Sequence, residues 1–140
     1  MNLFLDTSVV LAACGRPAGA SHFIFDTAGT QGWRLQTSAY VWSEVDHNLP
    51  ALAASARQEW LTLRSRLQPV PDIVSFEWAT IFAPAKDRPI LFTAAAWSDI
   101  LLTLDRRDFE GLLGNVFYRL PILKPGDFLK QQRANGKLRE

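Results

Sequence analysis

The sequence has one cysteine, two histidines and no long hydrophobic run, and each of these shortages excludes a class of protein. Cys14 cannot form an intramolecular disulfide, and with His22 and His47 it makes only three of the four ligands that a structural zinc site needs. The longest apolar runs, residues 9–14 and 92–97, are much shorter than the roughly 20 residues that span a bilayer. We therefore expect neither a disulfide framework, nor a structural zinc site, nor a membrane-spanning segment.

The N-terminus also lacks the basic region with which a signal peptide begins. Met1-Asn2-Leu3 carries no basic side chain, and Asp6 falls where a signal peptide is apolar. We therefore expect no targeting segment, and the low cysteine content suits the reducing cytoplasm.

The charges are nearly balanced over the whole chain but unevenly distributed along it. There are 15 basic and 14 acidic side chains, which give a net charge of +1. Residues 124–140 carry five basic and two acidic side chains, a net charge of +3, which leaves the rest of the chain slightly acidic. A polyanionic partner must therefore be attracted locally, by this basic C-terminal helix or tail, by arginine clusters or by bound metal.

What the chain does contain is typical of one folded α/β domain over residues 1–140. It is 48% hydrophobic and 21% charged, and its predicted strands and helices alternate. This alternation predicts a mostly parallel central sheet flanked by helices. Strands are predicted over residues 2–5, 33–36, 70–74, 100–104 and 120–123. Helices are predicted over residues 9–14, 21–28, 39–48, 51–67, 89–97, 106–113 and 127–134.

Four acidic residues follow or adjoin these elements at positions that can converge. Asp6 follows the first strand, and Asp105 follows the 100–104 strand. Asp87 lies at the start of the helix before that strand, and Glu44 lies in the helix after the 33–36 strand. Because ligands of an open parallel sheet bind outside the carboxyl ends of its strands, these side chains can meet in one cleft.

A cluster of carboxylates needs a cation, because like charges at short distance oppose one another's ionisation. Ligand sets made only of oxygen favour hard cations, here Mg²⁺ or Mn²⁺. One or two such ions can activate water and stabilise the leaving oxygen of a phosphodiester, which is nuclease chemistry.

Five segments give the chain a resemblance to the PIN-domain family that spans almost its whole length, in the same order. They read LFLDTSVVL at 3–11, TSAYVWSEV at 37–45, KDRPILFTAA at 86–95, DILLTLDRRDF at 99–109 and ILKPGDFL at 122–129. The resemblance implies a PIN-like, Rossmann-like three-layer sandwich and a metal-dependent endoribonuclease.

The resemblance also implies roles for individual residues. The catalytic and metal-binding acids that it indicates are Asp6, Glu44, Asp87 and Asp105, and Asp108 matches a further acidic position that some members use. The hydroxyls that it places nearby, to orient carboxylates or water, are those of Thr7, Ser8 and Thr103. Beside these acids, the basic side chains of Arg88, Arg106 and Arg107 are candidates for binding RNA phosphates.

Many small PIN proteins are similar to VapC-type toxins. The resemblance therefore implies RNA as the substrate, a small antitoxin protein as a partner and a homodimer as an assembly. Many toxin members have asparagine in a Thr-x-Asn context where this chain has Thr103-Leu104-Asp105. That difference bears on the toxin role and not on the nuclease role.

Several residues have alternative interpretations. Asp46 competes with Glu44, because two positions so close in sequence cannot share one helix face; if Glu44 points inward, Asp46 is a solvated neighbour. Asp99 is expected to cap or bond the turn at Trp97-Ser98. Of the residue types that often serve in catalysis, His47 is expected on the surface, and His22 and Cys14 are expected to be structural.

Other functions fit the sequence less well. A non-catalytic module that binds RNA or protein remains the alternative. Phosphatases of the haloacid-dehalogenase type need a second aspartate two residues after the nucleophile, where this chain has Ser8 after Asp6. A dinucleotide-binding domain needs G-x-G-x-x-G after its first strand, and this chain lacks that motif.

Overall fold

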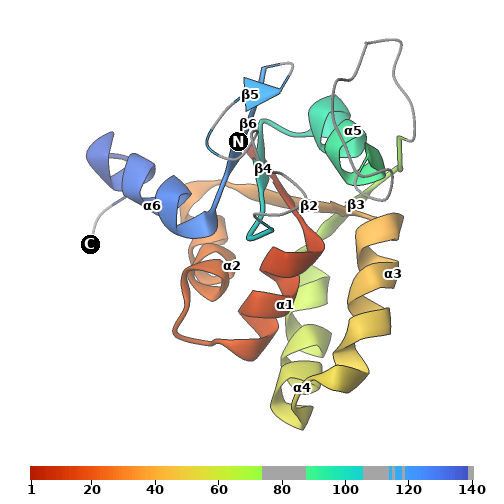
Figure 1. Cartoon of the computed structure of the whole chain (residues 1–140). Coiled ribbons are helices and arrows are strands. Elements are labelled where there is room, and N and C mark those ends of the chain that lie inside the picture. The colour runs from red at the N-terminus through yellow and green to blue at the C-terminus, as the bar shows by residue number, and fades with distance from the viewer. Residues whose placement is uncertain (74–87, 106–113, 115, 118, 139–140) are drawn as a thin grey trace.

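The computed structural model describes residues 1–73, 88–105, 114, 116–117 and 119–138. Within this part of the chain the strands form a six-stranded sheet in the order β3-β2-β1-β4-β6-β5 (Figure 1). Its strands are β1 (Asn2–Leu5), β2 (Arg34–Ser38), β3 (Gln68–Val70), β4 (Ile100–Leu102), β5 (Val116–Phe117) and β6 (Leu120–Leu123). All pairs are parallel except that of β5 with β6. The carboxyl ends of five strands therefore meet at one edge of the sheet.

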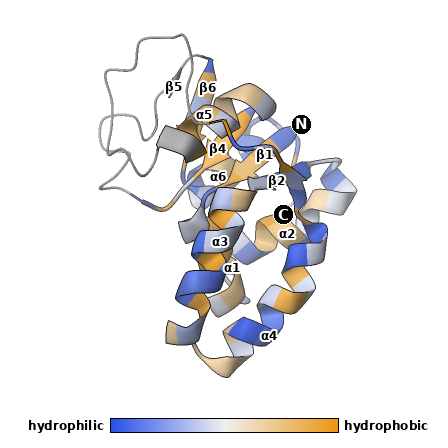
Figure 2. Ribbon diagram, turned by 90° about the vertical axis from the view of Figure 1, so that its right-hand side faces the viewer, coloured by the Kyte–Doolittle hydropathy of each residue, from blue (hydrophilic) through white to orange (hydrophobic). Residues whose placement is uncertain are grey.

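Helices lie on both faces of this sheet. They are α1 (Thr7–Gly15), α2 (Ala20–Gln31), α3 (Ala39–Asn48), α4 (Ala54–Leu63), α5 (Arg88–Trp97) and α6 (Pro125–Ala134). The chain moves from β1 to β2 to β3 in one direction and then returns to β4 on the other side of β1. Because such crossovers are right-handed, this reversal puts α5 on the face opposite α1 to α4, as Figures 1 and 2 show. The predicted α/β class with a mostly parallel sheet is confirmed.

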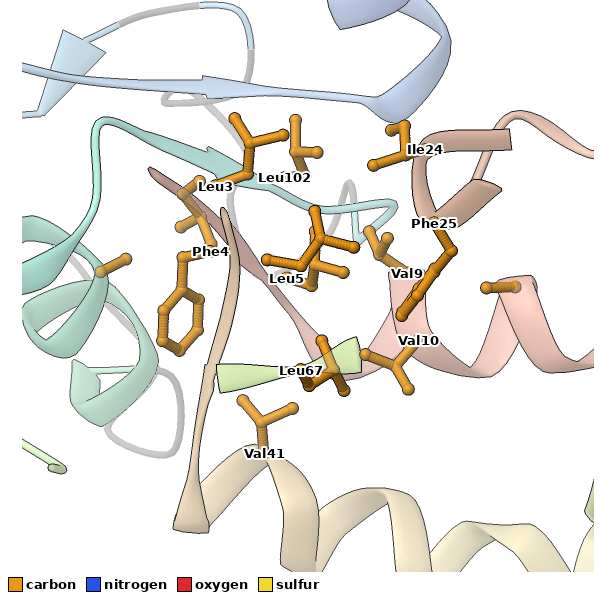
Figure 3. Packing of buried hydrophobic residues seen from close by; sticks show 14 of the residues in the cluster. Leu3, Phe4, Leu5, Val9, Val10, Ile24, Phe25, Val41, Leu67 and Leu102 are labelled. Atoms are coloured by element: carbon orange, nitrogen blue, oxygen red, sulfur yellow. The ribbon is translucent and has the colours of Figure 1, made fainter. Parts of the chain in front are cut away.

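The centre of the sheet is apolar on both faces. Leu3, Phe4 and Leu5 of β1 point alternately to the two faces, and all three are fully buried. Such a continuous apolar run is typical of parallel strands that are covered on both sides. Figure 3 shows these side chains among buried residues of α1, α2 and β4. Figure 2 shows the contrast with α3 and α4, where hydrophilic and hydrophobic residues alternate.

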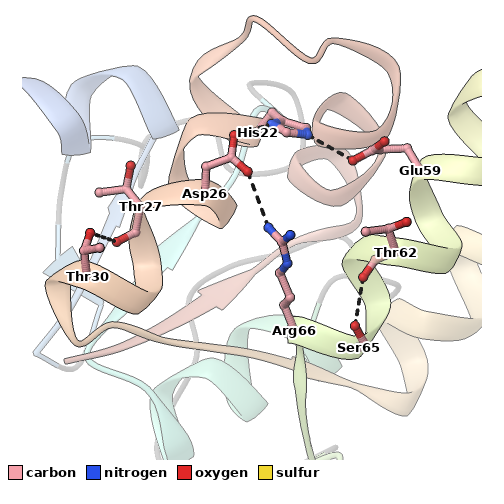
Figure 4. Close-up of polar contacts among 8 residues, drawn as sticks. All are labelled: His22, Asp26, Thr27, Thr30, Glu59, Thr62, Ser65 and Arg66. Carbon is pink, nitrogen blue, oxygen red and sulfur yellow. Dashed lines mark hydrogen bonds and ion pairs between the residues drawn. The ribbon is translucent and has the colours of Figure 1, made fainter.

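A polar cluster joins α2 to α4 (Figure 4). His22 contacts Asp26 through Nδ1 at 2.9 Å and Glu59 through Nε2 at 3.1 Å. Arg66 contacts the other oxygen of Asp26 at 3.4 Å. His22 thus connects two helices, which is the structural position expected of it, and Cys14 is buried.

Two predicted elements are wrong in their bounds. The helix predicted over 51–67 is α4 alone, because Leu49–Ala51 and Arg64–Arg66 form separate 3₁₀ turns. The strand predicted over 70–74 is β3, which shares only Val70 with the prediction. β3 lies at the edge of the sheet, where Pro69 costs no ladder hydrogen bond.

The remaining elements agree with their predictions to within a few residues, except that the short β5 was not predicted. The predicted helix over 106–113 lies outside the described residues. No helix in the described part of the chain combines the length and the apolar character that crossing a membrane requires.

Candidate functional site

The candidate site lies where the strand order reverses. Asp6 directly follows β1, and Asp105 comes three residues after the end of the adjacent β4. The two strands are in parallel register, with Leu5 opposite Leu102. In open α/β sheets, the crevice beyond the carboxyl ends of two such strands is where ligands bind.

Asp6 is held in a fixed orientation by its own helix and by a neighbouring strand. It is the N-cap of α1, and its Oδ1 accepts a hydrogen bond of 2.7 Å from the backbone N–H of Thr7. Its Oδ2 accepts bonds of 2.6 Å from the Thr103 hydroxyl and 3.2 Å from the Ser8 hydroxyl. The carboxyl group is therefore positioned by three donors, and only 5% of the residue is exposed.

The electrostatics of Asp6 are unusual for an aspartate. Burial raises its pKa to about 6, and the nearby negative charge of Glu44 acts in the same direction. The hydrogen bonds from Thr103, Thr7 and Ser8 oppose this shift but do not cancel it. A carboxylate at this position is thus poorly stabilised by the protein alone, and a bound cation would stabilise it.

Two hydroxyls connect Asp6 to the segment that carries Asp105. The Thr103 hydroxyl accepts a hydrogen bond of 3.0 Å from the backbone N–H of Asp105 while it donates to Asp6. The Ser8 hydroxyl accepts one of 3.0 Å from the backbone N–H of Leu104. The turn after β4 is therefore fastened to the start of α1, which fixes the backbone of Asp105 beside Asp6.

Glu44 reaches the same place from α3. Its Oε1 accepts a hydrogen bond of 2.8 Å from the hydroxyl of Thr7, the residue that follows Asp6. Asp46 instead accepts a bond of 3.2 Å from the indole Nε1 of Trp60 in α4. Of the two acids that competed for the inward position, the structure therefore turns Glu44 toward Asp6. Asp46 is exposed as expected, but its contact with Trp60 makes it more than a solvated neighbour.

The comparisons with known proteins bear on this arrangement. No protein-family model matches the chain, and no curated protein matches it. Among solved structures, the chain is similar to a chain in the crystal structure of VapBC2 from Rickettsia felis bound to a DNA fragment from their promoter. The match has a TM-score of 0.63 at 16% sequence identity and covers 89% of this chain and 98% of that chain. The chain has the PIN-like fold. The fold that the resemblance implied is thereby confirmed.

Within the PIN-like fold, several of the predicted residues lie outside the described part of the chain. These are Asp87, Arg106, Arg107 and Asp108. Arg88 is the first residue of α5, and its backbone alone is described.

Two other residues lie apart from the candidate site. Asp99 precedes β4, at the edge of the sheet opposite Asp105, and its Oδ2 accepts a hydrogen bond of 2.7 Å from the backbone N–H of Asn2. The expectation that Asp99 bonds the Trp97-Ser98 turn is therefore wrong. His47 is exposed in the last turn of α3, as expected.

The described residues do not by themselves form a metal site. No three acidic, histidine or cysteine side chains among them are grouped closely enough to hold a metal ion. Asp6 and Glu44 form no ion pair with a described basic side chain. Two neighbouring carboxylates that have no cationic partner among the described side chains, one of them buried, are a donor set that suits a hard divalent cation.

Proposed function

We propose that this protein is a metal-dependent endoribonuclease that hydrolyses RNA phosphodiesters at the Asp6 site. The observation that carries the proposal is the buried carboxyl group of Asp6, held by three donors beside Glu44 with no described cationic partner. Its place at the reversal of strand order in a PIN-like fold supports the same conclusion.

The proposed ion is Mg²⁺ or Mn²⁺, bound by Asp6, Glu44, Asp87 and Asp105, with Asp108 as a further ligand. When bound, the metal supplies an activated water and stabilises the leaving oxygen. In this proposal Asp6 is the central ligand because its position is the most constrained. Thr7, Ser8 and Thr103 act as positioning residues, since their hydroxyls orient Glu44 and Asp6. Arg88, Arg106 and Arg107 are proposed to bind RNA phosphates.

We further propose that the enzyme is a cytoplasmic toxin restrained by a small antitoxin protein and that it forms a homodimer. The support is the fold shared with a chain of the VapBC2 crystal structure. A short reading frame for a DNA-binding protein next to the gene is the expected genomic setting. A gene without such a neighbour would argue against the toxin role and leave the nuclease proposal untouched.

The test is cleavage of a panel of single-stranded RNAs in Mn²⁺, in Mg²⁺ and in chelator. We expect wild-type protein, freed of any partner, to cut RNA only when metal is present. Asp46→Asn is the matched control for Asp6→Asn, because it also replaces an aspartate by asparagine. Asp46 lies on α3 but bonds Trp60 of α4 rather than a residue of the candidate site. Cleavage lost in Asp6→Asn and kept in Asp46→Asn supports the proposal. Equal cleavage by wild type and Asp6→Asn contradicts it. Tight RNA binding without cleavage under every metal condition would favour the alternative of a non-catalytic module.

A further inference from the structure

A basic groove runs along the contact between α2 and α6, which pack side by side (Figure 1). It consists of two adjoining hollows of about 180 and 270 Å³ that share Gly19, Ala20 and Gly126. Leu104 lines the first hollow, and Leu129 lines the second. Because they share three residues, the two hollows form one continuous track, which we call the α2–α6 groove.

The charged side chains that line this groove in the described part of the chain are all basic. Arg16 lines the first hollow, and Lys130 and Arg133 line the second. None of the three forms an ion pair with another described residue. Three other hollows on the described surface each include an acidic side chain, either Asp26 or Asp46. The α2–α6 groove is thus selectively cationic, on a chain whose net charge is only +1.

Arg133 is held over the groove by an aromatic ring. Its guanidinium lies 5.8 Å from the ring centroid of Phe23, a distance typical of a cation–π contact. Phe23 is 38% exposed, and it lines the same hollow. The contact leaves the donor groups of Arg133 free to bind an anion in the groove.

The groove lies next to the segment that carries Asp105. Leu104, which lines its first hollow, donates its backbone N–H to Ser8 and immediately precedes Asp105. Pro125 and Gly126 follow β6 at the same edge of the sheet at which Asp6 follows β1. The first hollow therefore adjoins the turn that connects Ser8 with the segment carrying Asp105.

We propose that the α2–α6 groove binds the phosphates of single-stranded RNA on one side of the scissile bond. The choice of RNA rests on the proposed nuclease function, and the choice of phosphates rests on the three cations. The two hollows measure only about 180 and 270 Å³, which suits the backbone of one strand rather than a whole duplex. The groove would then hold the substrate in register with the Asp6 site whatever its sequence, since phosphate contacts carry no sequence information.

The proposal is tested by RNA binding without cleavage. The probe is a fluorescently labelled single-stranded RNA of mixed sequence, and its affinity is measured in chelator over a series of salt concentrations. The variants Arg16→Gln, Lys130→Gln and Arg133→Gln each remove one positive charge from an exposed side chain. Arg34→Gln is the matched control, because Arg34 is exposed at the amino end of β2, the opposite edge of the sheet. Unfolding temperatures verify that each variant is folded.

Each groove variant should weaken binding about fivefold at 0.1 M salt and reduce the slope of log affinity against log salt by about 0.7, the value for one phosphate contact to a single strand. Arg34→Gln should change neither quantity. The proposal is overturned if folded groove variants keep the wild-type slope, or if Arg34→Gln has the same effect as they do. It is also overturned if wild-type protein binds a duplex RNA, measured in the same way, more tightly than the single strand.

The outcome is separable from that of the nuclease proposal. Salt-dependent binding lost in the groove variants, with no metal-dependent cleavage by wild type, would support the groove and contradict the nuclease. Cleavage and RNA binding that are equal in wild type and in the groove variants would support the nuclease and overturn the groove.

Discussion

The hydroxyl of Thr103 donates a hydrogen bond of 2.6 Å to Oδ2 of Asp6, the shortest contact to that carboxyl group. Both groups are buried, and the same hydroxyl accepts the backbone N–H of Asp105. One side chain of the turn after β4 therefore orients the carboxyl group at the end of β1 and fixes the backbone of a second acid. The local order of the candidate site depends on this contact.

Thr103→Val tests the contact, because valine has nearly the same shape but no hydroxyl. We expect the unfolding free energy at pH 7 to fall by about 1.5–3 kcal/mol, the range for a hydrogen bond to a charged group. Metal-dependent cleavage should fall as well, while Thr103→Ser should restore much of both. The measurements are urea denaturation and the initial rate of RNA cleavage. Wild-type stability and activity in the valine variant would show that Thr103 does not position Asp6.

The raised pKa of Asp6 predicts a pH dependence with a definite sign. The folded protein keeps the Asp6 proton up to about pH 6, whereas the unfolded chain releases it near pH 3.8. Between these values the folded state binds more protons, so the contribution of Asp6 to stability falls as the pH rises from about 4 to 6. A pKa difference of about two units between the folded and unfolded states corresponds to about 3 kcal/mol in the free energy of unfolding. This contribution is fully present below pH 4 and is lost above pH 6.

Asp6→Asn isolates that contribution. Asparagine is also a good N-cap, so α1 should keep its start, and the buried charge is gone. The difference in unfolding free energy between wild type and Asp6→Asn, followed by urea denaturation without metal, should change by about 3 kcal/mol between pH 4 and pH 7, in favour of the variant. A difference that stays constant over this range would mean that Asp6 titrates normally.

Metal binding should depend on Glu44 and not on Asp46. A ligand at 100 times its Kd stabilises a protein by about 2.7 kcal/mol, which corresponds to roughly 8 °C in unfolding temperature for a chain of this size. We expect Mn²⁺ to produce a shift of this order in wild type and in Asp46→Asn, and little or none in Glu44→Gln. Thermal unfolding with and without Mn²⁺ measures it. A shift in unfolding temperature that is kept in Glu44→Gln and lost in Asp46→Asn would mean that Asp46, and not Glu44, is the acid that binds the metal.

The positions of Asp6 and Asp105 could be predicted from the sequence because each acid adjoins a short apolar strand. The pattern of a strand is local, and parallel strands bring their carboxyl ends to one edge. The predicted strand over 100–104 nevertheless ran on to Leu104, whereas β4 ends at Leu102. Thr103 and Leu104 do not continue the strand, because Thr103 bonds Asp6 and Leu104 bonds Ser8. These are contacts between distant parts of the chain, which a local pattern does not contain.

Other features depend on packing that no local pattern contains. Whether Glu44 or Asp46 faces Asp6 is decided by the rotation of α3 against α1 and α4, where Trp60 takes Asp46 as its acceptor. The hydroxyl of Thr7 orients Glu44 rather than Asp6, and this contact depends on the same rotation of α3. The α2–α6 groove joins Arg16 to Lys130 from opposite ends of the chain. Its only signal in the sequence is the basic charge of residues 124–140.

The most direct test of the central claim follows the initial rate of single-stranded RNA cleavage against Mn²⁺ concentration in wild type and Asp6→Asn. The proposed function predicts no cleavage in chelator, a rate that rises with Mn²⁺ and saturates in wild type, and a rate at least 100-fold lower in Asp6→Asn at every concentration. A rate independent of Mn²⁺, or one that saturates equally in both proteins, would contradict a metal-dependent site built on Asp6.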